Sequence, residues 1–301
     1  MLHVRQDRAM ERDSVGQIVL RDGTPMAFSE TGTGPVILAI HGWAASRGFF
    51  ADLAERLGDR YRVIVPDLRA HGDTPAGSLP LDMDTLAEDI TELMDKLDLD
   101  PVVLLGWSMG AMIAWAMIRQ SGPDRLSGLV VEDMTPRVLN DAGWDLGMSS
   151  GLTETSSARA TDLMRADWPA YAAGFAPRLF AASHADHALV LEAAEELARR
   201  DGEAMAALWV SMTAQDMRPV LGEMRLPVLV AHGAESAAYG PETSRYLVDT
   251  LPQADRLEFA HSGHTPHLEQ AEDFARAVDQ FASRLRAGAE LQENTEGSFS
   301  P

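Results

Sequence analysis

Short apolar runs alternate with helix-compatible segments along most of this 301-residue sequence. The runs "PVILAIHG", "YRVIVPD", "PVVLLG" and "LSGLVVED" have the length of buried strands. In the segment "DTLAEDITELMDKL", Leu86, Ile90, Leu93 and Leu97 recur at helical spacing and define one apolar face. Because strands separated by helices usually pair in parallel, the alternation predicts an α/β fold, with a mostly parallel central sheet flanked by helices.

The alternation stops after Thr135 and resumes after Arg225. The intervening stretch is helix-compatible, as in "ALVLEAAEELARR" and "EAMAALWVSMTAQ", and has no comparable strand run. We expect residues 1–135 and 226–287 to form one core and residues 136–225 a helical cap over the carboxyl edge of the sheet, where open α/β sheets bind ligands. The polar tail, residues 288–301, is predicted to be disordered.

Composition excludes several classes of protein. The formal net charge of −21 argues against nucleic acid and anionic membranes as partners, and favours a small, largely neutral molecule as substrate. No apolar run approaches the roughly 20 residues of a membrane span, and the N-terminal segment lacks the apolar core of a secretory signal, so a cytoplasmic location is expected. The absence of cysteine excludes thiolate catalysis and disulfides. Assembly of the chain into a homo-oligomer is compatible with these features.

The segment "GWSMG" places Ser108 between Gly106 and Gly110, after an apolar run and before a helix-compatible one. Alone, such a segment fits an ordinary glycine-rich packing turn. A sharp strand-to-helix turn is also the context in which a nucleophilic serine is held exposed. The start of the helix would then offer free N–H groups to an oxyanion.

Four segments together resemble the α/β-hydrolase superfamily, over about residues 19 to 285. These are "PVILAIHGWAAS", "VIVPDLRAHGDTP", "GWSMG" and "AHSGHTPHLEQAEDF". One departure is Ala70, where that family usually has glycine. The resemblance implies Ser108 as nucleophile, His264 as general base, and an oxyanion hole formed by the backbone N–H groups of Met109 and Trp43. It implies no cofactor.

A metal site is the competing interpretation of the histidine segment, because His261, His264 and His267 are spaced at i, i+3 and i+6. Carboxylates at a suitable spacing are missing from this segment, which disfavours a metal. An imidazole can instead take a proton from the serine and return it to the leaving group. We therefore expect no metal, with His261 and His267 as structural or rim residues.

The acid partner of His264 has three candidates. In most relatives the acid follows the strand that matches "LPVLVAHG", but the expected position here is Ser236, with Glu235 one residue early. The other known position is the end of the strand after the serine helix, in "LVVEDMTP". Alignment on "GPDR" selects Asp133 there, and Glu132 becomes the alternative. The sequence predicts Asp133 first, Glu132 second and Glu235 third.

These features favour a serine hydrolase of the esterase or lactonase kind, which cleaves a carboxylic ester or lactone of small to medium, largely apolar structure through an acyl-enzyme. Cofactor-independent dioxygenase-like or haloperoxidase-like activity on the same fold is an alternative, although such dioxygenases tend to carry histidine where this chain has Met109. A ligand receptor on a hydrolase fold is a third. The cap offers ten large apolar side chains as pocket candidates: Trp144, Met148, Met164, Trp168, Phe175, Phe180, Met205, Trp209, Met212 and Met217.

Overall fold

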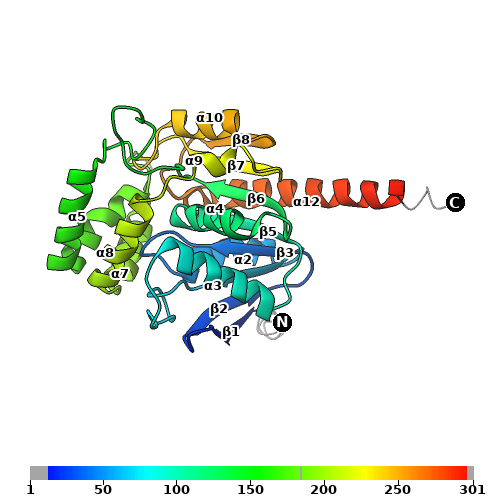
Figure 1. Ribbon diagram of the computed structural model, residues 1–301, viewed down its shortest axis with the longest axis horizontal. Helices are drawn as coiled ribbons and strands as arrows, with labels where there is room; N and C mark the ends of the chain where they lie inside the picture. Colours follow the sequence, from blue (N-terminus) through cyan, green and yellow to red (C-terminus); the bar gives the residue numbers. More distant parts are fainter. Residues whose placement is uncertain (1–12, 184, 297–301) are drawn as a thin grey trace, which may run out of the picture.

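A computed structural model describes residues 13–183 and 185–296. Its centre is an eight-stranded sheet with the order β1-β2-β4-β3-β5-β6-β7-β8 (Figure 1). The strands are β1 (Asp13–Val19), β2 (Pro25–Thr31), β3 (Val36–Ile40), β4 (Arg62–Pro66), β5 (Val102–Trp107), β6 (Leu126–Glu132), β7 (Val228–Gly233) and β8 (Ala254–Phe259). Strand β2 pairs antiparallel with β1 and β4, and all other neighbours are parallel. The predicted α/β class and mostly parallel sheet are confirmed.

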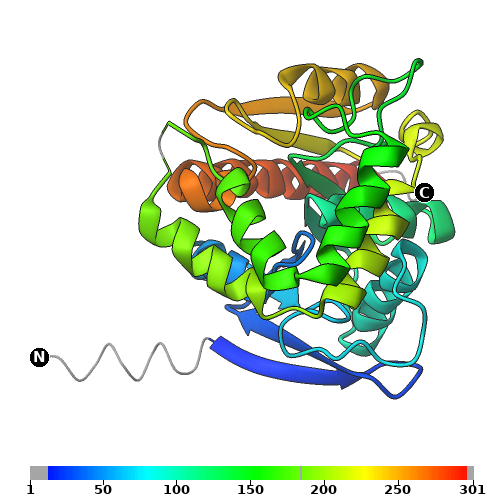
Figure 2. The same ribbon diagram turned by 90° about the vertical axis from the view of Figure 1, so that its left-hand side faces the viewer.

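Helices cover both faces of this sheet because its central strands are apolar on both sides. Every residue of β5 is buried, as is every residue of β7. Helices α2 (Ala51–Leu57) and α12 (Ala271–Glu296) pack together on one face, and α3 (Met83–Lys96) and α4 (Met109–Ser121) pack on the other (Figure 2). Helix α10 (Pro241–Thr250) lies against β7 and β8.

Most helices between β6 and β7 lie beyond the carboxyl edge of the sheet, in front of it in Figure 2. They are α5 (Glu154–Ala166), α6 (Trp168–Phe175), the short 3₁₀ helix η2 (Ala176–Leu179), α7 (His187–Ala198) and α8 (Gly202–Thr213). The short helix α9 (Arg218–Leu221) also precedes β7 but packs on α4. Helix α5 packs on α8, and α6 packs on α7. We retain residues 136–225 as the proposed extent of the cap.

The C-terminal helix is longer than the sequence predicts. Helix α12 continues to Glu296, whereas the tail was expected to be disordered from residue 288. Its last turns read "GAELQENTE", in which alanine, glutamate, leucine and glutamine are good helix formers that can extend a helix already anchored in the core. The rest of the predicted tail, residues 297–301, lies outside the described residues.

Helices of the described segments are too short or too polar to cross a membrane, the long α12 included.

Candidate active site

Ser108 occupies a strained turn between β5 and α4. Its backbone has φ 53° and ψ −120°, in the left-handed region that side chains normally avoid. The flanking glycines are required by close packing. A Cβ on Gly106 would lie 2.4 Å from the Ala111 nitrogen, and one on Gly110 would lie 2.1 Å from the Ile40 oxygen. The turn therefore has the geometry of a nucleophile elbow, which an ordinary packing turn does not need.

The loop after β3 lies directly beside this serine. A Cβ built on Gly42 would lie 3.3 Å from the Ser108 Cβ. Trp43 follows, and its indole nitrogen donates to the Met205 carbonyl of cap helix α8 at 3.0 Å. Met109 is the first residue of α4, so its N–H has no carbonyl partner within the helix. The two predicted oxyanion donors, at Trp43 and Met109, thus flank Ser108.

Asp133 and His264 form a buried pair at the same edge of the sheet. The Asp133 carboxylate accepts from His264 Nδ1 at 2.6 Å, and both residues are almost fully buried. Asp133 follows the last residue of β6 and, like Ser108, has a positive φ, here 44°. Burial by itself raises the pKa of Asp133, but hydrogen bonds from His232 and His264 outweigh it and lower that pKa below its usual value.

Two further groups donate to the Asp133 carboxylate. His232, the penultimate residue of β7, approaches Oδ1 with its Nδ1 at 3.0 Å. The Ser236 hydroxyl donates to Oδ2 at 2.5 Å. Ser236 stands where most relatives were expected to carry the acid. The β7 loop therefore contributes a hydrogen-bond donor to a carboxylate that comes from β6.

The alternative acids have other partners. Glu132 points away from His264, because successive strand residues face opposite ways. Its carboxylate accepts from the backbone N–H of His267 at 2.9 Å and from His267 Nδ1 at 2.8 Å, in a fully buried contact. Glu235 accepts a hydrogen bond from the Ser183 hydroxyl. Of the three predicted acids, the structure brings only Asp133 to His264.

The loop that carries His264 is fixed from three sides. The Trp107 indole donates to the His264 carbonyl at 2.8 Å, and the His264 N–H donates to the Leu179 carbonyl of η2 at 2.8 Å. Glu269 accepts from the Gly263 N–H at 2.7 Å and from the Ala181 N–H at 2.6 Å. The loop is thereby tied both to the elbow strand and to the cap.

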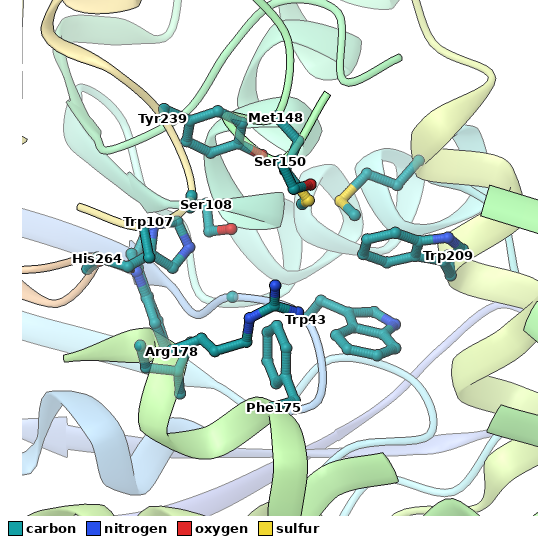
Figure 3. Close-up of a pocket in the computed structure, with 15 residues that line it drawn as sticks. Trp43, Trp107, Ser108, Met148, Ser150, Phe175, Arg178, Trp209, Tyr239 and His264 are labelled. Carbon is teal, nitrogen blue, oxygen red and sulfur yellow. The ribbon is translucent and has the colours of Figure 1, made fainter. Parts of the chain in front are cut away.

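A cavity opens over Ser108 and His264 (Figure 3). Its walls are mostly apolar, with Arg178 as the charged side chain among them. The lining residues are Gly42, Trp43, Trp107, Ser108, Met148, Ser150, Phe175, Arg178, Leu179, Trp209, Met212, Ala237, Ala238, Tyr239 and His264. Of the apolar cap residues singled out from sequence, four line this cavity: Met148, Phe175, Trp209 and Met212. The others belong mainly to the cap's own packing, as shown by Trp168, whose indole donates to the Leu197 carbonyl.

Two other buried histidines brace the oxyanion loop. His41 Nδ1 donates to the Gly42 carbonyl at 2.8 Å, and its Nε2 accepts from the Leu68 N–H at 3.1 Å. His71 Nε2 accepts from the Ala44 N–H at 3.1 Å. Each acceptor role requires an unprotonated nitrogen. Burial lowers the pKa of His41 to about 4, and burial with the nearby His41 lowers that of His71 well below its usual value.

Several residues of this site could not be predicted from the sequence. His232 stands directly before Gly233 in "LVAHG", and Ser236 three residues beyond it, but neither carries a signal of contact with β6. Arg178 lies in a cap segment without any motif. The predicted histidine cluster separates in space, since His264 and His267 bind different carboxylates. Within the described residues, no group of histidine, aspartate or glutamate side chains is arranged to hold a metal ion.

Comparison with known proteins defines the class. A family model described as the alpha/beta hydrolase fold matches residues 35–271, most of the chain. The protein belongs to the α/β-hydrolase family and is a hydrolase.

Its curated relatives include the pimeloyl-[acyl-carrier protein] methyl ester esterase of Chromobacterium violaceum, which is 29% identical over 83% of this chain and 96% of the relative. Among solved structures, a thermophilic esterase from Thermogutta terrifontis superposes with a TM-score of 0.80 at 28% identity, covering 90% of this chain and 99% of that one. An esterase from Exiguobacterium antarcticum gives 0.84 at 24% identity over 90% and 100%, which shows the shared fold.

Proposed function

We propose that this protein is a serine hydrolase that cleaves a carboxylic ester or lactone through an acyl-enzyme, with Ser108, His264 and Asp133 as its triad. The observation that carries the proposal is the buried 2.6 Å contact between His264 Nδ1 and the Asp133 carboxylate, beside the cavity that Ser108 and His264 both line. A carboxylate on Nδ1 fixes the imidazole tautomer and leaves Nε2 free to act on a hydroxyl.

In the proposed mechanism, the Ser108 oxygen attacks the ester carbonyl while His264 Nε2 takes the hydroxyl proton. The N–H groups of Met109 and Trp43 stabilise the oxyanion, each typically by about 2.7–4 kcal/mol. The tetrahedral intermediate collapses, His264 returns the proton to the departing alkoxide, and an acyl-serine ester remains. Water, deprotonated by the same nitrogen, then attacks that ester and releases the acid and the free serine.

The comparisons support an ester as the scissile group. The Chromobacterium violaceum relative is named a methyl ester esterase, and the Thermogutta terrifontis neighbour is named an esterase. The apolar cavity supports an acyl part with a substantial apolar portion. Methyl esters of aliphatic acids are therefore the first substrates to test, with lactones of similar size beside them.

Ser108→Ala tests the proposal directly. We expect turnover of methyl and 4-nitrophenyl esters to fall by at least a thousandfold, because no other group in the mechanism forms the acyl intermediate. A fluorophosphonate probe should label Ser108, and peptide mapping should find Ser46 and Ser262 unlabelled. Residual turnover above a few per cent in a correctly folded variant would reject Ser108 as nucleophile. Product formation that requires dioxygen would instead support the oxygenase alternative.

A further inference from the structure

We propose that Arg178 makes this cavity selective for esters that carry a free carboxylate, so that the preferred substrate is a half-ester of a dicarboxylic acid. The inference rests on the proposed function and names its substrate class. It replaces the expectation of a largely neutral substrate with that of an apolar chain that bears one charge.

Arg178 lies in η2 and reaches into the cavity. Figure 3 shows its guanidinium end directed into the space bounded by Ser108 and His264 on one side and by Trp43 on the other. Among the described residues that line this cavity, none is an aspartate or a glutamate. In a protein of net charge −21, the lining is therefore locally positive.

The backbone beside Arg178 is held against the loop that carries the proposed base. The Leu179 carbonyl accepts from the His264 N–H at 2.8 Å and from the Thr265 hydroxyl at 3.1 Å. The base of the Arg178 side chain is thus fixed relative to His264. A ligand group bound by the guanidinium would consequently lie within the reach of one arginine side chain from the loop that carries His264.

Within residues 13–183 and 185–296, no carboxylate forms an ion pair with Arg178, and no hydrogen bond occupies its guanidinium. Other arginines of the chain have carboxylate partners. Arg69 is buried between Asp22 and Asp89, and Arg200 pairs with Glu196. Because guanidinium donors are strongly polar, an arginine that projects into an apolar cavity without a protein acceptor keeps its donors available for a ligand.

The chemistry of the site favours a carboxylate. A guanidinium presents a planar fork of N–H donors that matches two carboxylate oxygens. A single cation balances one negative charge, whereas a phosphate monoester carries nearly two and would remain under-neutralised in this acidic protein. The side chains of Trp43, Phe175 and Met212 line the same cavity and suit a chain of methylene groups between the carboxylate and the ester.

The test compares matched substrates in matched variants. Monomethyl esters of straight-chain dicarboxylic acids are assayed beside methyl esters in which a terminal carboxamide replaces the carboxylate, across a series of chain lengths. For wild type we expect kcat/KM to favour the carboxylate at its best length by about tenfold, a moderate factor because Arg178 is exposed to solvent. The preference should weaken as salt is added.

Arg178→Met should remove the preference, so that the ratio of kcat/KM for carboxylate and carboxamide esters falls to about one, whereas Arg178→Lys should retain part of it because the charge remains but the fork is lost. The control is Arg165→Met, on the cap surface in α5, where the guanidinium pairs with Glu203. It should behave as wild type.

Equal kcat/KM for both ester types in wild type, or a preference that survives Arg178→Met, would overturn the inference and leave the hydrolase proposal intact. Ester turnover that survives Ser108→Ala would overturn the hydrolase proposal instead. If no ester in the series is turned over, binding of the intact half-esters to Ser108→Ala by calorimetry decides between carboxylate and carboxamide. Tighter competition by an ester that ends in phosphate would reject the carboxylate assignment.

Discussion

At the scale of single residues, the carboxylate at Asp133 is the centre of the site. It accepts from His264, His232 and Ser236, while its neighbour Glu132 serves His267 in the core. The proposed catalytic acid, Asp133, and the structural acid, Glu132, are thus adjacent residues. The difference comes from strand alternation and from the positive φ at Asp133.

Asp133→Asn should lower kcat by about 10⁴, because an amide cannot stabilise the imidazolium and favours the wrong tautomer of His264. Glu132→Gln keeps an acceptor for the His267 backbone N–H, so its kcat should stay within a few-fold of wild type while its melting temperature falls. Glu235→Gln should leave both values close to wild type. Kinetics on a 4-nitrophenyl ester and thermal melts provide the comparison. A collapse of activity in Glu235→Gln alone would place the acid after β7.

His232 is predicted to position and tune the proposed acid. His232→Asn offers an amide nitrogen where Nδ1 stood, so its activity should stay within about threefold of wild type. His232→Leu leaves Asp133 Oδ1 without that donor, which removes one of the hydrogen bonds that lower the pKa of Asp133 and strengthens the attraction of its carboxylate for a protonated His264. We expect the acid limb of the kcat/KM profile to move to higher pH by about one unit. If the acid limb of the kcat/KM profile does not move in His232→Leu, His232 only packs against Asp133 and does not tune it.

At the scale of elements, the cap contacts the oxyanion loop as well as the substrate cavity. Helix α8 accepts the Trp43 indole hydrogen bond through Met205, and Arg200, which follows α7, donates to the Ala44 carbonyl at 3.1 Å. Ala44 itself has a φ of 64°, in the left-handed region. The cap therefore helps hold a strained loop whose N–H is a proposed oxyanion donor.

Arg200→Met should lower kcat by about tenfold with a small change in KM, because the oxyanion donor is then positioned less well. Arg199→Met is the matched control. Arg199 is the adjacent residue, it is exposed, and among the described residues its side chain pairs with Glu196. Steady-state kinetics separate kcat from KM. Equal effects of the two substitutions would show that cap stability, and not the loop contact, is responsible.

Two cap tryptophans should respond differently to truncation. Trp209 lines the cavity, so Trp209→Ala should shift the preferred acyl chain towards longer esters. Trp168 packs edge-on against Trp43 with ring centroids 5.4 Å apart and lies outside the cavity lining. Trp168→Ala should cost about 3–5 kcal/mol of stability with the acyl profile retained. Rates across a series of acyl lengths, together with urea unfolding, test both expectations.

At the scale of the whole molecule, the buried histidines make stability depend on pH. His41 and His71 are neutral in the fold, because each accepts a backbone hydrogen bond and burial depresses its pKa. The two histidines make their full contribution to the free energy of unfolding above about pH 6.5, the pKa of histidine in the unfolded chain. As pH falls from there towards about 4, the unfolded chain takes up protons that the fold does not, and the contribution is lost.

The free energy of unfolding should therefore fall between pH 6.5 and about 4, by about 1.4 kcal/mol per pH unit for each histidine that stays neutral. Urea titrations at several pH values measure this slope. His71→Asn should make it shallower, and His187→Gln, at an exposed position on the cap, should leave it unchanged. Imidazole NMR signals of His41 and His71 that titrate near 6.5 in the folded protein would contradict the explanation.

How much of the fold and site can be predicted from the sequence depends on how far apart the interacting residues lie along the chain. Strand and helix alternation, the Ser108 turn and the His264 loop are local patterns, and each was found from sequence. Asp133 needed an alignment, since its identity as partner depends on where β6 ends. Contacts such as His232 with Asp133 join residues 99 positions apart and have no local signature. Ala70, the departure from the family pattern, has a φ of 61°, the conformation in which glycine is unstrained.

Helix α12 offers an attachment point for a tether, a label or a fusion partner. It is 26 residues long, about 39 Å at the usual rise per residue, and Figure 1 draws its far end on the side opposite the cap helices. A surface tether, a fluorescent label or a fused partner attached after this helix would stand away from the cavity mouth. An enzyme immobilised in this way would present its cavity to the solution, and its kcat/KM on the support should approach that of the free protein.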